Sequence, residues 1–197
     1  MKYSLSFVVY GHFYTKMILE ASFKQNKKAV LKEYKAIIKR AKDIAPSNNP
    51  LTGSYALAAI FIAMNRKNDS SPEKNLELLE NGFRYTPWVK RFLGSGNGYF
   101  ADKRMKARYE WSKRTHEKKY ENVWVVDIIG KNGKYEMGYD YTECGVCKLC
   151  KDEGVPHLAK YMCSLDYLLV DIIGIGLDRN TTIAEGGDKC DFRFYEK

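Results

Sequence analysis

The hydrophobic pattern of this 197-residue chain first changes from helical to strand-like near Glu121, and this change limits the folds that the chain can adopt. Before Glu121, apolar residues recur at intervals of three and four, most clearly from Asn26 to Ala45, as they do along amphipathic helices. After Glu121 they alternate with polar residues, as they do along β-strands. Helices followed by strands are typical of an α+β fold, in which helices cover an antiparallel sheet.

The helical part, residues 1–120, contains one segment that is apolar nearly all round, residues 55–67. This segment predicts a central helix buried on several sides, with Thr52 or Ser54 as its cap. A further helix is expected from about Gly11.

A fourth helix has clear signals at its start. Ser70 and Glu73 have the spacing of a capping box, and Pro72 suits a first helical turn. We expect this helix to run toward Leu93 and to bend on the way at Pro87. The glycine-rich segment 94–98 that follows lacks the Lys-Ser/Thr of a phosphate-binding loop, so we interpret it as a linker.

The second part, residues 121–197, predicts two β-hairpins separated by a helix. The expected segments are residues 122–143 for the first hairpin, 156–173 for the helix, and 175–185 with 190–195 for the second hairpin. We therefore expect a single α+β domain, residues 1–197, with N-terminal helices on one face of a C-terminal antiparallel sheet of about four strands.

The net charge of +9 makes anionic partners plausible, whether nucleic acid, a membrane surface or a small carboxylate. Residues 102–120 carry eight Lys or Arg with interleaved aromatics, a composition found in nucleic-acid-binding segments. No known nucleic-acid motif accompanies them, so we interpret the segment as a solvated helix face and expect no nucleic-acid partner.

The chain is expected to be cytoplasmic and not to enter a membrane. Its longest apolar run, Tyr55 to Met64, is half the length of a bilayer span, and its first residues lack a secretory signal pattern. Five cysteines, an odd number, favour reduced thiols over a disulfide framework.

All five cysteines lie in the second part of the chain. Cys144, Cys147 and Cys150 are three residues apart, and with a fourth ligand such as His157 they could hold zinc or an iron–sulfur cluster. One CxxC pattern without a second pair is a weak metal signal. We predict no metal or cofactor, and we keep a site at these three cysteines as an alternative.

Cys163 and Asp166 lie within one turn of the helix expected at residues 156–173, so they are neighbours on one surface. A thiol beside a carboxylate can serve as a nucleophile whose partner orients water or accepts a proton. The simpler interpretation is a small buried thiol and a solvated acid. In the last strand, Cys190 shares the face of the phenylalanines and Arg193 faces the other way. If helices cover the phenylalanine face, Cys190 and Cys163 meet in a cavity between sheet and helix.

These residues resemble the L-2-amino-thiazoline-4-carboxylic acid hydrolase family. The resemblance rests on YTEC at Tyr141–Cys144, on Cys163 with Asp166, and on TTIAEGGDKCDFRF at Thr181–Phe194. The chain is also similar to vinyl-4-reductase-type small-molecule-binding domains, whose fold packs helices on one side of an antiparallel sheet.

The resemblance implies a hydrolase that opens a small cyclic amidine of the thiazoline type, which bears a carboxylate, to an N-carbamoyl amino acid. It implies Cys163 as nucleophile or binding thiol and Asp166 as the acid–base residue. Arg193 would pair with the substrate carboxylate. The expected substrate-binding residues are Cys144, His157, Cys190 and Arg193.

A different class of function stays open. The same fold could form a non-catalytic module that binds a small molecule, or whose thiols bind metal or respond to oxidation. A homo-oligomer is compatible with either function.

Overall fold

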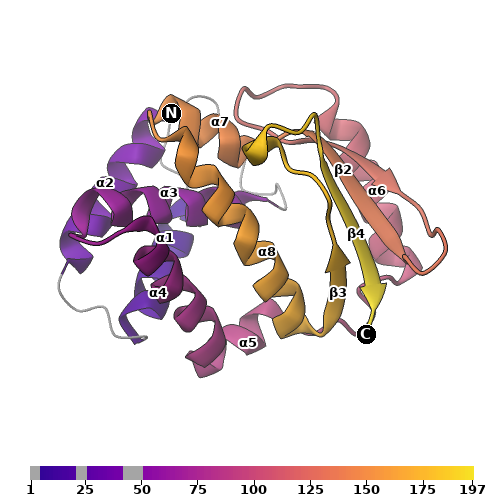
Figure 1. The fold of residues 1–197 in the computed structure, drawn as a ribbon, viewed down its shortest axis with the longest axis horizontal. Helices are drawn as coiled ribbons and strands as arrows, with labels where there is room; N and C mark the ends of the chain where they lie inside the picture. Colours follow the sequence, from indigo (N-terminus) through magenta and orange to yellow (C-terminus); the bar gives the residue numbers. More distant parts are fainter. Residues whose placement is uncertain (1–4, 21–25, 42–50) are drawn as a thin grey trace.

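The computed structural model describes residues 5–20, 26–41 and 51–197, and it has the α+β architecture that the sequence predicts (Figure 1). Helices α1 to α5 form one side of the molecule and a sheet forms the other. The helices are α1 (Leu5–Glu20), α2 (Lys27–Arg40), α3 (Thr52–Lys67), α4 (Pro72–Tyr85), α5 (Pro87–Leu93), α6 (Asp102–Thr115), α7 (Gly145–Asp152) and α8 (Ala159–Ile173). The strands are β1 (Val125–Ile129), β2 (Met137–Glu143), β3 (Ile175–Asp178) and β4 (Cys190–Glu196), and residues 156–158 and 183–185 form short 3-10 helices.

Helix α3 is the centre of the helical side. Its residues from Tyr55 to Met64 are buried, as the apolar pattern predicts, and it packs against α1, α2, α4 and α7. The expected caps are wrong, because Thr52 and Ser54 lie inside the helix and the preceding residue, Leu51, makes no side-chain capping bond.

Several other helix ends differ from the sequence expectation. Helix α1 begins at Leu5, six residues before Gly11, and the end of the helix expected at residues 26–45 lies partly outside the described residues. Ser71 rather than Ser70 caps α4, since its hydroxyl accepts a hydrogen bond from the Lys74 N–H. The helix expected to run on to Leu93 is divided in two at Thr86, because Pro87 cannot continue the backbone hydrogen bonds of α4.

The sheet is antiparallel throughout, with strand order β1-β2-β4-β3. Tyr141 pairs with Cys190 and Tyr139 with Phe192, so these four side chains share one face. Strand β3 is shorter than expected: it ends at Asp178, and the chain then forms the 3-10 turn at residues 183–185.

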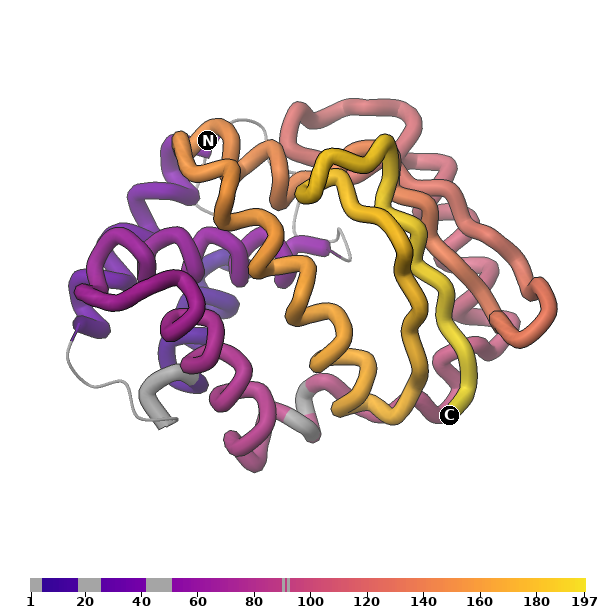
Figure 2. The backbone as a smooth tube through the Cα atoms, in the orientation of Figure 1, coloured from indigo at the N-terminus to yellow at the C-terminus, as the bar shows by residue number. Residues whose placement is uncertain are grey.

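Helix α8 lies between the helical side and the sheet (Figures 1 and 2). It packs against β3 on one side and α4 on the other, and it ends at Gly174, whose φ of 85° is the left-handed conformation that favours glycine. The segment 94–98, expected to be a linker, is held against this end of the helix. The Gly96 N–H donates to the Ile173 carbonyl at 2.6 Å.

The edge strand β1 is covered by α6. The Ser112 hydroxyl donates to the Val126 carbonyl at 2.7 Å, and the Val126 N–H donates to the Thr115 hydroxyl at 3.1 Å. Side chains of α6 thus satisfy backbone groups that an open sheet edge would leave available for pairing with another chain.

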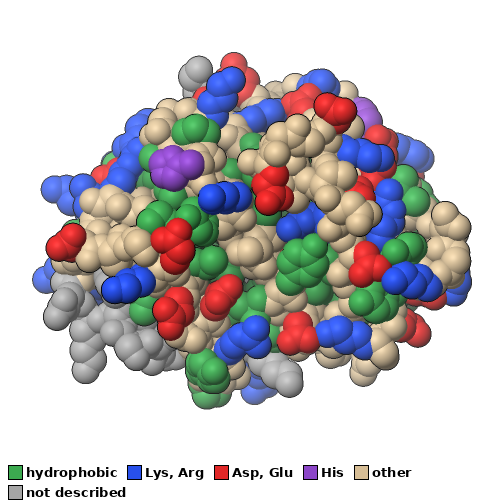
Figure 3. Space-filling view, viewed as in Figure 1, with side chains coloured by type: hydrophobic (Ala, Val, Ile, Leu, Met, Phe, Trp, Pro, Cys, Tyr) green, Lys and Arg blue, Asp and Glu red, His purple; other side chains and the backbone are tan. Residues whose placement is uncertain are grey.

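Charged side chains of both signs are interspersed over the face seen in Figure 3. In the described part of the chain, no helix is both long enough and apolar enough to cross a membrane.

Candidate active site

A cavity of about 290 Å³ lies between α8 and the inner face of the sheet. Five aromatic or sulfur-bearing side chains of the sheet form one wall, namely Tyr139, Tyr141, Cys190, Phe192 and Phe194. Helix α8 forms the opposite wall. The rest of the described lining comes from the start of α3 and the residue before it, from Cys144 and Val146 at the start of α7, and from Leu93, Tyr99 and Trp124. Most of this lining is apolar, so polar groups inside the cavity are few and poorly hydrated.

Four of the residues singled out from the sequence line this cavity and interact electrostatically with one another, which places them together at one end: Cys144, Cys163, Asp166 and Cys190. Cys163 and Asp166 project from neighbouring positions of α8, as the helical spacing predicts. Cys190 begins β4 and faces inward, as the strand alternation predicts. Cys144 joins β2 to α7. Three thiols and one carboxylate therefore surround a single space, which we call the thiol end.

Arg179, which follows β3, holds the α8 side of the thiol end in place. Its guanidinium lies 2.7 Å from an Asp166 carboxylate oxygen and donates to the Cys163 carbonyl at 2.9 Å. It also stacks on the Phe192 ring, with 4.9 Å between the guanidinium carbon and the ring centroid. One buried cation thus connects the catalytic candidates of α8 with strand β4.

The protonation of Asp166 is shifted by its surroundings. Removal from water raises the pKa of its carboxyl to about 6, although Arg179 opposes the shift. A carboxyl with a pKa near 6 can both donate and accept a proton close to neutral pH.

The three thiols of the cavity differ in acidity. Burial raises the pKa of Cys163, and it raises the pKa of Cys190 to about 11. The pKa of Cys144 is lowered, because the Cys147 thiol and the N–H groups at the amino end of α7 favour its thiolate. The pKa of the neighbouring Cys147 thiol is raised, chiefly through the hydrogen bond with Cys144. Cys144 is therefore the cavity thiol that ionises first.

Two residues that were expected to bind substrate, Arg193 and His157, lie outside the cavity. Arg193 projects from the outer face of the sheet, where it binds an Asp140 oxygen at 2.7 Å, because odd and even residues of β4 face opposite sides. His157 is exposed on the 3-10 helix before α8. The structure brings neither of them into the cavity.

The remaining cysteines do not line the cavity. Cys147 lies beside Cys144, and Cys150 is fully buried in the core with no exposed surface. Among the described residues, no group of three or more His, Cys, Asp or Glu side chains is arranged to hold a metal ion.

Sequence reasoning missed Arg179. The residue lies in a loop, where no helical or strand period predicts its direction, and its partner Asp166 is thirteen residues earlier. The one available signal was a charged residue directly after a buried strand.

The comparisons with known proteins support one family. The profile of the L-2-amino-thiazoline-4-carboxylic acid hydrolase family matches residues 51–194, well over half of the chain, and this stretch contains every described lining residue of the cavity. No curated protein and no solved structure matches the chain significantly. By this match, the chain belongs to the L-2-amino-thiazoline-4-carboxylic acid hydrolase family.

Proposed function

We propose that the protein is a hydrolase that opens a cyclic amidine of the thiazoline type, bearing a carboxylate, to an N-carbamoyl amino acid. The observation that carries this proposal is the meeting of Cys144, Cys163, Asp166 and Cys190 at one end of an apolar cavity. The family to which the chain belongs supports the same reaction class.

In the proposed first step, the Cys144 thiolate attacks the amidine carbon between the ring nitrogen and the ring sulfur. The carbon–sulfur bond of the ring breaks, and protonated Asp166 supplies the proton that the departing sulfur takes up. The substrate is now open-chain and bound to Cys144 through its amidine carbon.

In the second step, the Asp166 carboxylate removes a proton from water as the oxygen attacks the same carbon. The bond to Cys144 breaks and the thiolate returns. The second water proton moves from the oxygen to the former ring nitrogen, so the carbon keeps the oxygen as the carbonyl of an N-carbamoyl group. One water is consumed and Asp166 is again protonated, so the cycle balances.

The electrostatics of the thiol end support these roles. Cys144 has the lowered thiol pKa, whereas burial keeps Cys163 protonated. In this proposal Cys163 is a binding thiol, which was one of its two roles expected from the resemblance. Arg179 is a positioning residue, because it holds the Asp166 carboxylate without lining the cavity.

The test is turnover of 2-amino-thiazoline-4-carboxylic acid, followed by the appearance of free thiol. Cys144→Ala should abolish turnover, and Asp166→Asn should lower kcat about 100-fold or more, as expected when an acid–base group is removed. Cys163→Ala should retain part of the activity. Cys150→Ala, which removes a buried thiol outside the cavity, is the control and should keep wild-type kcat.

A cavity with this lining also suits a non-catalytic binding module, since its walls are largely apolar. That alternative predicts that cyclic amidines bind and are released unchanged. Full activity in Cys144→Ala would contradict the nucleophile assignment, and binding without any turnover in the wild-type protein would favour the module.

A further inference from the structure

The cavity is longer than its volume alone suggests. Cys190 and Phe194 both line it, and four residues of β-strand span about 13 Å. On the opposite wall, Cys163 and Ile173 both line it, and ten residues of helix span about 15 Å. We call the end formed by Tyr99, Tyr139, Phe194 and Ile173 the tyrosine end, and it lies opposite the thiol end.

A cation stands directly behind the tyrosine end. The Arg108 guanidinium lies 4.1 Å from the centroid of the Tyr99 ring and donates to the Tyr99 carbonyl at 2.6 Å. Burial raises the pKa of the Tyr139 hydroxyl, and the nearby Arg108 acts against that rise. Two cavity-lining phenols therefore stand close to one guanidinium.

Arg108 differs from the other cations of its helix. It is the only one of the six Lys and Arg residues of α6 that is not exposed, because it shares the inner face of the helix with Met105 and Trp111. Within the part of the chain that the structure describes, no carboxylate forms an ion pair with it. A half-buried cation without a carboxylate partner favours the binding of an external anion.

The thiol end has the opposite polarity. Asp166 lies there, and Cys144 is the thiol most readily ionised, so an anionic group is disfavoured. Neither Arg179 nor Arg108 lines the cavity itself, but Arg179 behind the thiol end is already paired with Asp166, whereas Arg108 behind the tyrosine end has no carboxylate partner among the described residues. The cavity therefore has two chemically different ends: an anion is favoured at the tyrosine end and disfavoured at the thiol end.

We propose that the natural ligand of this cavity is elongated, with a carboxylate or similar anion at the Tyr99–Tyr139–Arg108 end, an apolar middle, and its reactive group at the thiol end. The proposal rests on the proposed function for the nature of the reactive group. A thiazoline whose carboxylate is attached to its own ring is too short to reach both ends. The preferred substrate therefore carries an apolar spacer between the ring and the carboxylate.

The test uses octanoate, octanol and acetate as probes, with dissociation constants measured by isothermal titration calorimetry. Octanoate should bind far more tightly than acetate, because each added methylene that enters the cavity strengthens binding about threefold to fourfold. Arg108→Gln should weaken octanoate binding at least about tenfold and leave octanol binding unchanged. Tyr139→Phe should weaken octanoate binding less than Arg108→Gln does.

The matched control is Arg104→Gln, which removes the same charge from an exposed position of the same helix. It should leave all three affinities unchanged, and unchanged octanol binding by Arg108→Gln shows that this variant is folded. Equal losses in both arginine variants, or octanoate binding no tighter than acetate binding, would overturn the proposal. Because no bond is cleaved, these results do not depend on whether the protein hydrolyses cyclic amidines.

Discussion

At the scale of single residues, Asp166 connects the chemistry of the site with the stability of the fold. Its carboxyl has a pKa near 3.9 in an unfolded chain and about 6 in the folded protein. Between these two pH values the folded state binds more protons than the unfolded state. The raised pKa of Asp166 therefore makes a stabilising contribution to the free energy of unfolding. This contribution is fully present below about pH 4 and is lost as pH rises through about 6.

We therefore expect the wild-type free energy of unfolding to fall relative to that of Asp166→Asn as pH rises from about 4 to about 7. The asparagine cannot ionise, so the variant lacks this contribution to the pH dependence. Urea denaturation of both proteins at several pH values measures the difference. Parallel stability profiles would show that the Asp166 pKa is not raised.

The sequence was informative about these residues where a regular period fixed their direction. Cys163 and Asp166 followed from helical spacing, and Cys190 from strand alternation. Arg179 and Tyr99 did not follow, because both lie in connecting segments whose side-chain directions depend on long-range packing. The lowered pKa of Cys144 was likewise hidden, because it depends on the spatial position of Cys147 and the start of α7.

At the scale of secondary-structure elements, the contact between helix α6 and strand β1 depends on the hydroxyl groups of two α6 side chains. The Val126 backbone is fully buried, and its N–H and carbonyl bind Thr115 and Ser112 respectively. Thr115→Val keeps the side-chain shape but leaves the Val126 N–H without a partner. We expect a loss of about 1–3 kcal/mol in the free energy of unfolding, measured by urea denaturation.

Ser164→Ala is the matched control for this prediction. Its hydroxyl is exposed and bonds only within α8, to the Tyr161 carbonyl, so its removal should change stability by less than about 0.5 kcal/mol. If both variants lose the same stability, the α6 hydroxyls do not hold the strand edge.

The elements themselves were largely predictable, and their ends were not. Long periodic segments such as α2 and α8 appear where the pattern placed them. The ends of β3 and the cap of α3 depend on local hydrogen bonds that many residue types can make. The partial burial of Arg108 was also missed. Helix α6 is strongly basic, and its sequence does not show which of its Lys and Arg residues faces inward.

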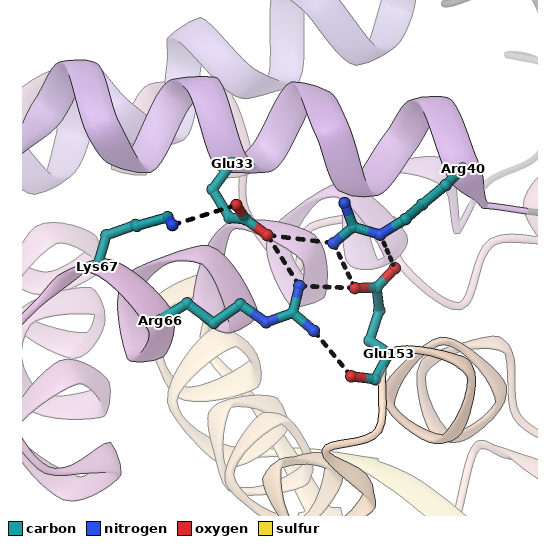
Figure 4. A network of polar contacts seen from close by, with 5 residues as sticks. All are labelled: Glu33, Arg40, Arg66, Lys67 and Glu153. Atoms are coloured by element: carbon teal, nitrogen blue, oxygen red, sulfur yellow. Dashed lines mark hydrogen bonds and ion pairs between the residues drawn. The ribbon is translucent and has the colours of Figure 1, made fainter.

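At the scale of the whole molecule, a polar network ties the end of α7 to the helical side (Figure 4). The Glu153 carboxylate accepts hydrogen bonds from Arg40 at 2.8 Å and from Arg66 at 2.7 Å. Arg66 also donates a hydrogen bond to the Glu153 carbonyl. Glu33 and Lys67 extend the network across α2 and α3. It connects segments more than 80 residues apart, next to the helix that carries Cys147.

Glu153→Gln should lower the free energy of unfolding by about 1–2 kcal/mol, because its side chain is only 5% exposed and pairs with two guanidinium groups. The loss should shrink as salt is added, since Arg40 is partly exposed and its charge is screened. Glu110→Gln removes an exposed pair with Lys113 and is the control, with an expected change near zero. A loss in Glu153→Gln that does not depend on salt would argue against an electrostatic role.

The cavity has a consequence for how the substrate can be found. The apolar walls of this cavity enclose about 290 Å³ and do not touch across it, so the protein chain alone makes fewer van der Waals contacts there than a packed core would. A compound that fits the space restores those contacts only in the folded state, and it raises the melting temperature in proportion to the logarithm of its concentration over its dissociation constant. Thermal melting in the presence of a metabolite collection therefore reports directly on complementarity to this cavity, before any reaction is assumed.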